Sequence, residues 1–265
     1  MSATPDAGLL ASPPNLRFDG RIAWITGASR GLGRALAFAM AGAGARVVIS
    51  ARSTESLLRI ADEVEAAGGS ILPLPCSVDD PVEIAAAVSR IESEFGRLDA
   101  LFNNAGVSTH FKEAEQLDLD DLRPTIETNL FGPFSCCMAA LPLLEASDGA
   151  SVVNVSSIHG SRGFERLISY AMSKGGLEML TRTLAIEWAP KGIRVNSLAP
   201  AYLTTEMSAG LLDHPYWGEK LRERTPLGRF GTPAELVGCA MFLASGAATY
   251  VTGTTLFADG GWSAS

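Results

Sequence analysis

A short apolar run that breaks at once into three glycines constrains the fold more than any other feature. The run is Ile22–Thr26, and Gly27, Gly31 and Gly33 follow it before an Ala/Leu-rich stretch. A buried strand, a glycine turn and a helix N-terminus together present backbone N–H groups and the positive end of a helix dipole to a phosphate. The pattern therefore predicts a phosphate-binding turn, although the glycine spacing differs from the common G-x-G-x-x-G.

Beyond this turn, short apolar runs of strand length alternate with stretches of helical periodicity that end at glycine or proline. This alternation predicts the α/β class, as a single doubly wound Rossmann domain with a mostly parallel sheet of about seven strands and helices on both faces. The expected strands cover residues 22–26, 46–50, 71–74, 98–102, 150–155, 193–198 and 254–258, and the expected helices cover residues 31–41, 53–67, 81–95, 119–144, 169–188 and 233–243.

The domain organisation follows from local composition. Residues 1–15 are small, polar and proline-bearing, which predicts a flexible N-terminal extension, and residues 16–265 show no linker that would divide them. Residues 202–229 are polar and aromatic with weak periodicity, and they are too long for an ordinary connection, so we expect a substrate lid there. Gly132 and Pro133 predict a break or kink within residues 119–144.

Composition excludes several functional classes. The net charge is −8 and no Lys/Arg cluster occurs, so we expect no nucleic-acid partner. No apolar run is long enough to cross a membrane, and the N-terminus does not resemble a signal peptide. The 4 cysteines and 3 histidines have no metal-ligand spacing. We therefore expect a cytoplasmic protein with reduced thiols, no membrane partner and no metal.

Tyr170 and Lys174 lie four residues apart in an expected helix and so share one of its faces. A free phenol titrates near pH 10 and exchanges protons poorly at neutral pH. A nearby ammonium favours the phenolate, so we expect Lys174 to lower the pKa of Tyr170. A surface Tyr–Lys pair is the alternative interpretation of this motif taken alone.

Several further short motifs occur in a defined order along the chain. Thr26-Gly27-x-x-x-Gly31-x-Gly33, Asn103-Asn104-Ala105-Gly106, Asn129, Ser157, Tyr170-x-x-x-Lys174 and Asp259-Gly260-Gly261 follow one another along the sequence. In this order and spacing they resemble the short-chain dehydrogenase/reductase family over nearly the whole chain beyond Leu16. Residues 225–229 and 259–262 look like gluconate 5-dehydrogenase-like members, whereas residues 26–33 look equally like 3-oxoacyl-carrier-protein reductases.

The resemblance implies a ketone–alcohol interconversion with a nicotinamide cofactor. Tyr170 would be the acid/base, Ser157 would hold the carbonyl oxygen, and Lys174 would lower the pKa of Tyr170 and bind the nicotinamide ribose. Asn129 would hold a water molecule in a proton relay behind Lys174. These four residues are the expected catalytic set.

NADP(H) is the expected cofactor. NAD sites in such folds usually carry an acidic residue at the end of the second strand, and the family pattern places that position on Ala51, with Arg52 next to it. Arg30 lies inside the glycine motif, and two guanidinium groups suit a 2′-phosphate. The expected cofactor-binding residues are Gly27, Ser29, Arg30, Gly31, Leu32, Gly33, Arg52, Ser77, Val78, Asn104, Ala105, Gly106, Tyr170, Lys174, Pro200 and Thr205.

Two positions depart from the family pattern. Ser77 stands where an aspartate often contacts adenine, and only a weaker hydroxyl contact is expected from it. Ala201 follows Pro200 where the family has glycine, and an alanine would be strained if that position required a positive φ. Ser108, His159 and Tyr202 are the expected substrate-binding residues, because they fall on loops that should border the pocket.

The expected partner is a small carbonyl or alcohol substrate, and the resemblance suggests a homotetramer or homodimer. A catalytically silent NADP-binding regulatory or scaffold protein on the same fold is the alternative function. Such proteins tend to lose the tyrosine or lysine, so the complete set of Asn129, Ser157, Tyr170 and Lys174 favours an enzyme.

Overall fold

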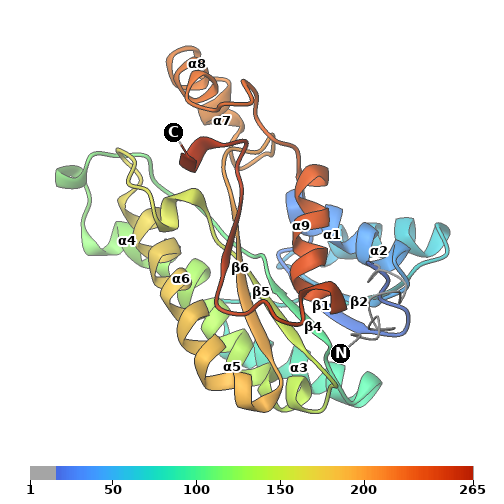
Figure 1. Ribbon diagram of the computed structural model, residues 1–265. Coiled ribbons are helices and arrows are strands. Elements are labelled where there is room, and N and C mark those ends of the chain that lie inside the picture. Colours follow the sequence, from blue (N-terminus) through green and yellow to red (C-terminus); the bar gives the residue numbers. More distant parts are fainter. Residues whose placement is uncertain (1–15, 265) are drawn as a thin grey trace, which may run out of the picture.

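The computed structural model describes residues 16–264, which form one seven-stranded sheet in the order β3-β2-β1-β4-β5-β6-β7 (Figure 1). Every neighbouring pair of strands is parallel. The chain reverses its direction of winding between β1 and β4, which is where ligands bind in sheets of this kind. The strands are β1 Ile22–Thr26, β2 Arg46–Ser50, β3 Ser70–Pro73, β4 Ala100–Asn103, β5 Ser151–Val155, β6 Arg194–Pro200 and β7 Thr255–Ala258.

Helices cover both faces of this sheet (Figure 1). Buried side chains of α1, α2 and α9 pack on one face, and those of α3, α5 and α6 pack on the other. Because both faces are covered, the central strands β1, β4 and β5 are buried along their whole length and are mostly apolar. The helices are α1 Gly31–Gly42, α2 Thr54–Ala66, α3 Pro81–Phe95, α4 Leu119–Ile126, α5 Gly132–Glu145, α6 Ile168–Trp188, α7 Ala209–Leu212, α8 Pro215–Glu223 and α9 Pro233–Ala244.

The expected fold class is confirmed, and the expected strands and long helices are present with ends displaced by a few residues. The break expected at Gly132 and Pro133 takes the form of a π-helical turn, Glu127–Phe131, directly before α5. Pro133 has no N–H to donate, so a wider turn just before it accommodates the missing hydrogen bond. The extension expected at residues 1–15 lies outside the described residues.

The stretch expected to form a lid contains two short helices, α7 and α8, which stand beyond the carboxyl ends of the strands (Figure 1). Leu212 of α7 and Trp217 and Leu221 of α8 are buried, so the two helices form a packed unit. Within residues 16–264, no helix is both long and apolar enough to cross a membrane.

Candidate active site

A cavity of about 1070 Å³ runs along the carboxyl ends of the central strands and beneath the segment with α7 and α8. It is large enough for a dinucleotide with a small substrate. Of the residues expected from the sequence, only Gly33 and Asn129 do not line it. The lining includes Gly27, Ser29, Arg30, Gly31, Leu32, Arg52, Ser77, Val78, Asn104, Ala105, Gly106, Ser108, Ser157, His159, Tyr170, Lys174, Pro200, Tyr202 and Thr205.

The glycine turn is fixed by the strand beside it. Asn104 donates its side-chain N–H to the carbonyl oxygens of Thr26 at 2.9 Å and Gly27 at 3.0 Å. A Cβ on Gly27, whose φ is +64°, would lie 2.6 Å from the Cα of Ala105. A Cβ on Gly33 would lie 2.4 Å from the Asn104 side-chain nitrogen. Both positions therefore require glycine, and Gly33 acts by packing and not by lining the cavity.

The N-terminus of α1 opens into this cavity. Its first residue is Gly31, and no side chain caps the helix, so its first N–H groups remain available. Thr205 approaches from the opposite wall, because a Cβ on Gly31 would lie 3.7 Å from its methyl group. Free N–H groups at the positive end of a helix dipole suit a diphosphate.

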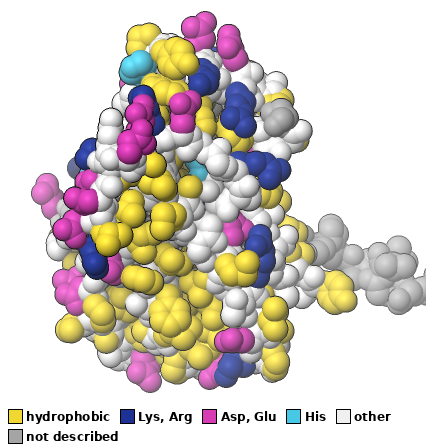
Figure 2. All heavy atoms as spheres, turned by 90° about the vertical axis from the view of Figure 1, so that its left-hand side faces the viewer, with side chains coloured by type: hydrophobic (Ala, Val, Ile, Leu, Met, Phe, Trp, Pro, Cys, Tyr) yellow, Lys and Arg dark blue, Asp and Glu magenta, His cyan; other side chains and the backbone are white. Residues whose placement is uncertain are grey.

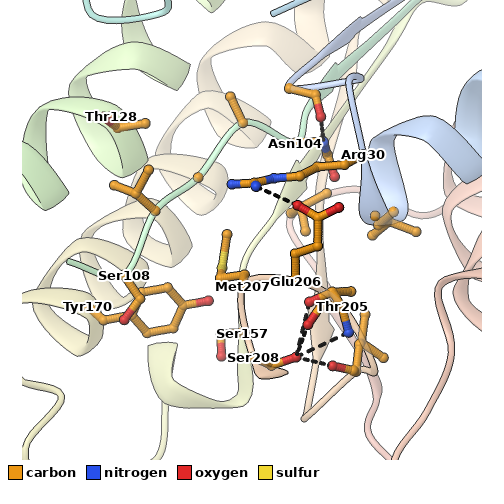
Figure 3. Close-up of a pocket in the computed structure, with 18 of the residues that line it drawn as sticks. Arg30, Asn104, Ser108, Thr128, Ser157, Tyr170, Thr205, Glu206, Met207 and Ser208 are labelled. Atoms are coloured by element: carbon orange, nitrogen blue, oxygen red, sulfur yellow. Dashed lines mark hydrogen bonds and ion pairs between the residues drawn. The ribbon is translucent and has the colours of Figure 1, made fainter. Parts of the chain in front are cut away.

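Arginine side chains line one end of the cavity. Ala51 and Arg52 line it as expected, and Arg59 of α2 joins them. Arg30 also lines this region, but its Nη1 lies 2.7 Å from Oε2 of Glu206 (Figure 3). The acidic residue that would accept ribose hydroxyls is replaced by Ala51, so this end of the cavity suits an additional phosphate better than free hydroxyls.

Tyr170 and Lys174 both lie on α6 at the cavity wall. Nζ of Lys174 donates to the carbonyl of Val155 at 2.8 Å and lies 5.7 Å from the centre of the Tyr170 ring. Burial lowers the pKa of Lys174 to about 8, although the nearby Glu178 opposes this shift. In the view of Figure 3, Ser157 lies just below the hydroxyl end of the Tyr170 side chain.

The pKa of Tyr170 is raised and not lowered. Burial penalises the phenolate, and the Ser157 hydroxyl only partly offsets this effect. The net shift of this pKa is therefore opposite in direction to the expected one. The sequence pattern predicts that Tyr170 and Lys174 share a helix face, but it does not predict how deeply Tyr170 is buried.

Asn129 lies behind the cavity, within the π-helical turn. Its Oδ1 accepts from the Val107 N–H at 2.8 Å, and its Nδ2 donates to the Val107 carbonyl at 2.8 Å and to Oγ of Ser173 at 3.1 Å. The side chain is therefore fully engaged in holding the segment after β4 against α6. Gly106 lies between Asn129 and Lys174, since a Cβ there would be 3.3 Å from Oδ1 and 3.6 Å from Nζ.

Aromatic side chains surround the other end of the cavity. The ring centre of His159 lies 5.4 Å from that of Phe164 and 5.7 Å from that of Tyr202. Ser108 lines the same space, as does Trp217 of α8.

The backbone at Ala201, where the family has glycine, is unstrained. Within residues 16–264 the only non-glycine residue with a positive φ is Arg166.

Comparison with known proteins decides the family. The family model described as enoyl-(acyl carrier protein) reductase matches residues 27–263. D-Threitol dehydrogenase of Mycolicibacterium smegmatis is 35% identical over 248 residues, which are 94% of this chain and 95% of that protein. The chain belongs to the short-chain dehydrogenase/reductase family. It is an oxidoreductase, as are its named relatives.

Two further members of this family extend the comparison. The 3-oxoacyl-[acyl-carrier-protein] reductase of Thermotoga maritima is 36% identical over 93% of this chain and 99% of that protein. The crystal structure of a gluconate 5-dehydrogenase from Burkholderia cenocepacia in complex with NADP and tartrate has a TM-score of 0.90 and 35% identity, covering 94% of this chain and 98% of that one.

Sequence reasoning missed three charged residues of this short-chain dehydrogenase/reductase cavity, namely Arg59, Asp79 and Glu206. Arg59 lies on α2, seven positions after Arg52, and no local pattern marks it as a residue of the cavity. Glu206 follows Thr205 directly, but its pairing with Arg30 spans 176 positions and has no local signature.

Proposed function

We propose that the protein interconverts a ketone and a secondary alcohol with NADP(H), using Tyr170 as the acid/base. One observation carries this proposal: Ser157, Tyr170 and Lys174 line the same cavity as the uncapped N-terminus of α1. A dinucleotide whose diphosphate binds at that helix would extend its nicotinamide toward the three polar side chains that bind the reacting oxygen.

The residues present fit NADP(H). The N-terminus of α1 suits the diphosphate, and Arg52 and Arg59 beside the uncharged Ala51 suit a 2′-phosphate. A gluconate 5-dehydrogenase of similar structure has been solved with NADP. Thr205 lines the cavity near Gly31 and would contact the nicotinamide carboxamide.

When bound, the nicotinamide supplies or accepts the hydride. Ser157 orients the carbonyl oxygen, and Tyr170 gives it a proton as the alkoxide forms. The raised pKa of Tyr170 keeps the phenol protonated at neutral pH, which is the state that reduction requires. Lys174 contributes its charge beside the ring and binds the nicotinamide ribose.

Asn129 acts as a positioning residue. Its amide is committed to Val107 and Ser173, so a water in the proton relay would bind its backbone carbonyl instead. The π-helical turn favours this role, because a wider turn disturbs the regular pairing of backbone carbonyls.

A silent NADP-binding regulatory or scaffold protein remains the competing function. The complete catalytic set favours an enzyme, since a scaffold does not require a buried Lys174 whose pKa burial lowers to about 8.

Unpaired thiols at all four cysteines fit a reducing compartment, and we propose a cytoplasmic location.

We also propose a homotetramer or homodimer. The face of the molecule shown in Figure 2 carries a broad apolar area over the α4–α5 and α6 region. A self-association surface explains why large apolar side chains are left exposed there. They include Phe131, Phe134, Ile168, Met172, Met179 and Ile186, which are 39–77% exposed.

Tyr170→Phe tests the proposed function, with the fully exposed Tyr250→Phe as the matched control. We expect the Tyr170 variant to bind NADPH, measured by cofactor fluorescence, and to lose at least about a thousandfold in kcat against a panel of ketones, within the range of acid–base catalysis. Substantial activity in this variant would refute Tyr170 as the acid/base. Wild-type protein that binds NADPH but oxidises it with no ketone would support the silent alternative.

A further inference from the structure

His159 and Tyr202 form a hydrogen-bonded pair beside the catalytic serine. Nε2 of His159 lies 2.9 Å from the Tyr202 hydroxyl, and the His159 backbone N–H donates to Oγ of Ser157 at 3.2 Å. The imidazole is 5% exposed, and four aromatic rings surround it. The pair is therefore held rigidly against the site at which the reacting oxygen would bind.

The partners of His159 fix its tautomer. Nδ1 lies 3.2 Å from the carbonyl oxygen of Arg162, which can only accept a hydrogen bond, so Nδ1 carries the proton. Burial lowers the pKa of His159 to about 4, so the ring is neutral at physiological pH. Nε2 therefore presents a lone pair to Tyr202.

The hydroxyl proton of Tyr202 is consequently committed to His159. A phenol has one proton and two lone pairs, so the Tyr202 oxygen is left as an acceptor toward the cavity that it lines. Burial raises the pKa of Tyr202, which keeps the phenol neutral. Tyr202 and Tyr170 both lie against the His159 ring, whose centre is 5.7 Å from that of Tyr202 and 6.5 Å from that of Tyr170.

We propose that Tyr202 selects substrates that carry a hydroxyl group next to the reacting carbonyl, that is, α-hydroxy ketones and the corresponding vicinal diols. Because Ser157 and Tyr170 bind the reacting oxygen, the Tyr202 hydroxyl oxygen can accept a hydrogen bond from a donor on the neighbouring carbon of the substrate. This inference rests on the proposed function and adds the substrate class to it.

A hydroxyl is the donor that the surroundings favour. The other simple donor is an ammonium group, but a cation already lies near Tyr202. Arg224 is close enough to lower its pKa and stacks on Trp262 at 3.8 Å, and Arg166 lines the same cavity. A second positive charge there would be repelled.

The test compares three ketones of one carbon skeleton: 1-hydroxy-2-butanone, 1-methoxy-2-butanone and 2-butanone. The methoxy group withdraws electrons much as the hydroxyl does but cannot donate a hydrogen bond, so it controls for intrinsic reactivity. We expect wild-type kcat/KM to favour the hydroxy ketone over the methoxy ketone about tenfold, as one net hydrogen bond provides.

Two variants distinguish a hydrogen bond that Tyr202 accepts from the substrate hydroxyl from a merely structural effect of this side chain on the site. Tyr202→Phe is expected to bring the hydroxy-to-methoxy ratio of kcat/KM near one, and the exposed Tyr250→Phe is the matched control that keeps it. His159→Leu returns the phenol proton to the cavity, so Tyr202 becomes a donor and the ratio should move toward the methoxy ketone. NADPH binding reports whether each variant is folded.

The outcomes distinguish this inference from the proposed function. Reduction of all three ketones by the wild type with a ratio near one, or a ratio unchanged in Tyr202→Phe, would overturn the inference and leave the proposed function standing. Wild-type protein that binds NADPH but reduces no ketone would overturn the proposed function and the inference together.

Discussion

Nη1 of Arg30 lies 2.7 Å from Oε2 of Glu206, which ties the glycine turn to the segment that leads into α7 (Figure 3). The two side chains are 60% and 72% exposed, so the pair contributes little to stability. Its position is more important than its strength. The carboxylate lies on the wall of the proposed cofactor cavity and engages a guanidinium that a phosphate would otherwise attract.

Glu206→Gln is therefore expected to tighten NADPH binding. The change removes a negative charge from the cavity and releases Arg30. The interaction energy of an exposed ion pair is small, so we expect the Kd for NADPH to fall about two- to fivefold. Fluorescence titration with NADPH at low and high salt measures it, and the gain should shrink as salt screens the charges. The surface variant Glu223→Gln is the control, and weaker binding by Glu206→Gln would show that Glu206 supports the bound cofactor instead.

Arg59→Ala is expected to lower the preference for NADPH over NADH. If Arg59 pairs with the 2′-phosphate, the loss of one partly exposed charge-assisted contact should reduce kcat/KM for NADPH about tenfold and leave that for NADH nearly unchanged. Arg90→Ala, on the surface of α3, is the matched control. An equal loss with both cofactors would contradict a role in recognising the 2′-phosphate.

Gly27→Ala is expected to destabilise the fold by about 2–4 kcal/mol, because a methyl group would require both a positive φ and an overlap with Ala105. Urea unfolding measures the change in the free energy of unfolding. Gly238→Ala is the control: it lies within α9 with nothing within 4 Å of an added Cβ, and it should be stabilising by about 0.5–1 kcal/mol. Equal effects of the two changes would refute this account of the glycine turn.

These cases show which parts of the site the sequence could reveal. The strand, turn and helix around Gly27 follow from local periodicity and from the few residues that tolerate a positive φ, so they were predictable. Arg59 and Glu206 could not be assigned, because their place in the cavity depends on how α2 and the segment before α7 pack. The direction of the Tyr170 pKa shift was missed for a similar reason, since burial outweighs the hydrogen bond with Ser157.

Phe134→Glu tests the proposed self-association. The side chain is 46% exposed on α5 and belongs to the apolar residues proposed for self-association, and a charge buried in an interface is strongly unfavourable. Light scattering after size exclusion should give a multiple of the 27.8 kDa chain mass for the wild type and a smaller assembly for the variant. Leu58→Glu is the matched control, because Leu58 is 51% exposed on α2. A monomeric wild type would exclude the proposal.

Lys174→Met is expected to change how stability depends on pH. Burial lowers the pKa of Lys174 from 10.5 to about 8, so the unfolded chain binds this proton more tightly than the folded one. Below pH 8 both states are protonated and the full cost of burying the charge opposes folding. Between pH 8 and 10.5 the folded state alone loses its proton, so that cost declines as pH rises.

The wild type should therefore gain stability relative to Lys174→Met by about 2 kcal/mol between pH 7 and pH 9.5. Urea unfolding of both proteins at the two pH values measures this difference. The unpaired Val155 carbonyl in the variant adds a cost that does not depend on pH, so it cancels from the comparison. The exposed Lys191→Met is the matched control, and a difference that stays constant with pH in the Lys174 variant would mean that the buried amine keeps its usual pKa. Lys174 would then be fully charged at the pH of catalysis, and its electrostatic role beside Tyr170 would be larger than the structure indicates.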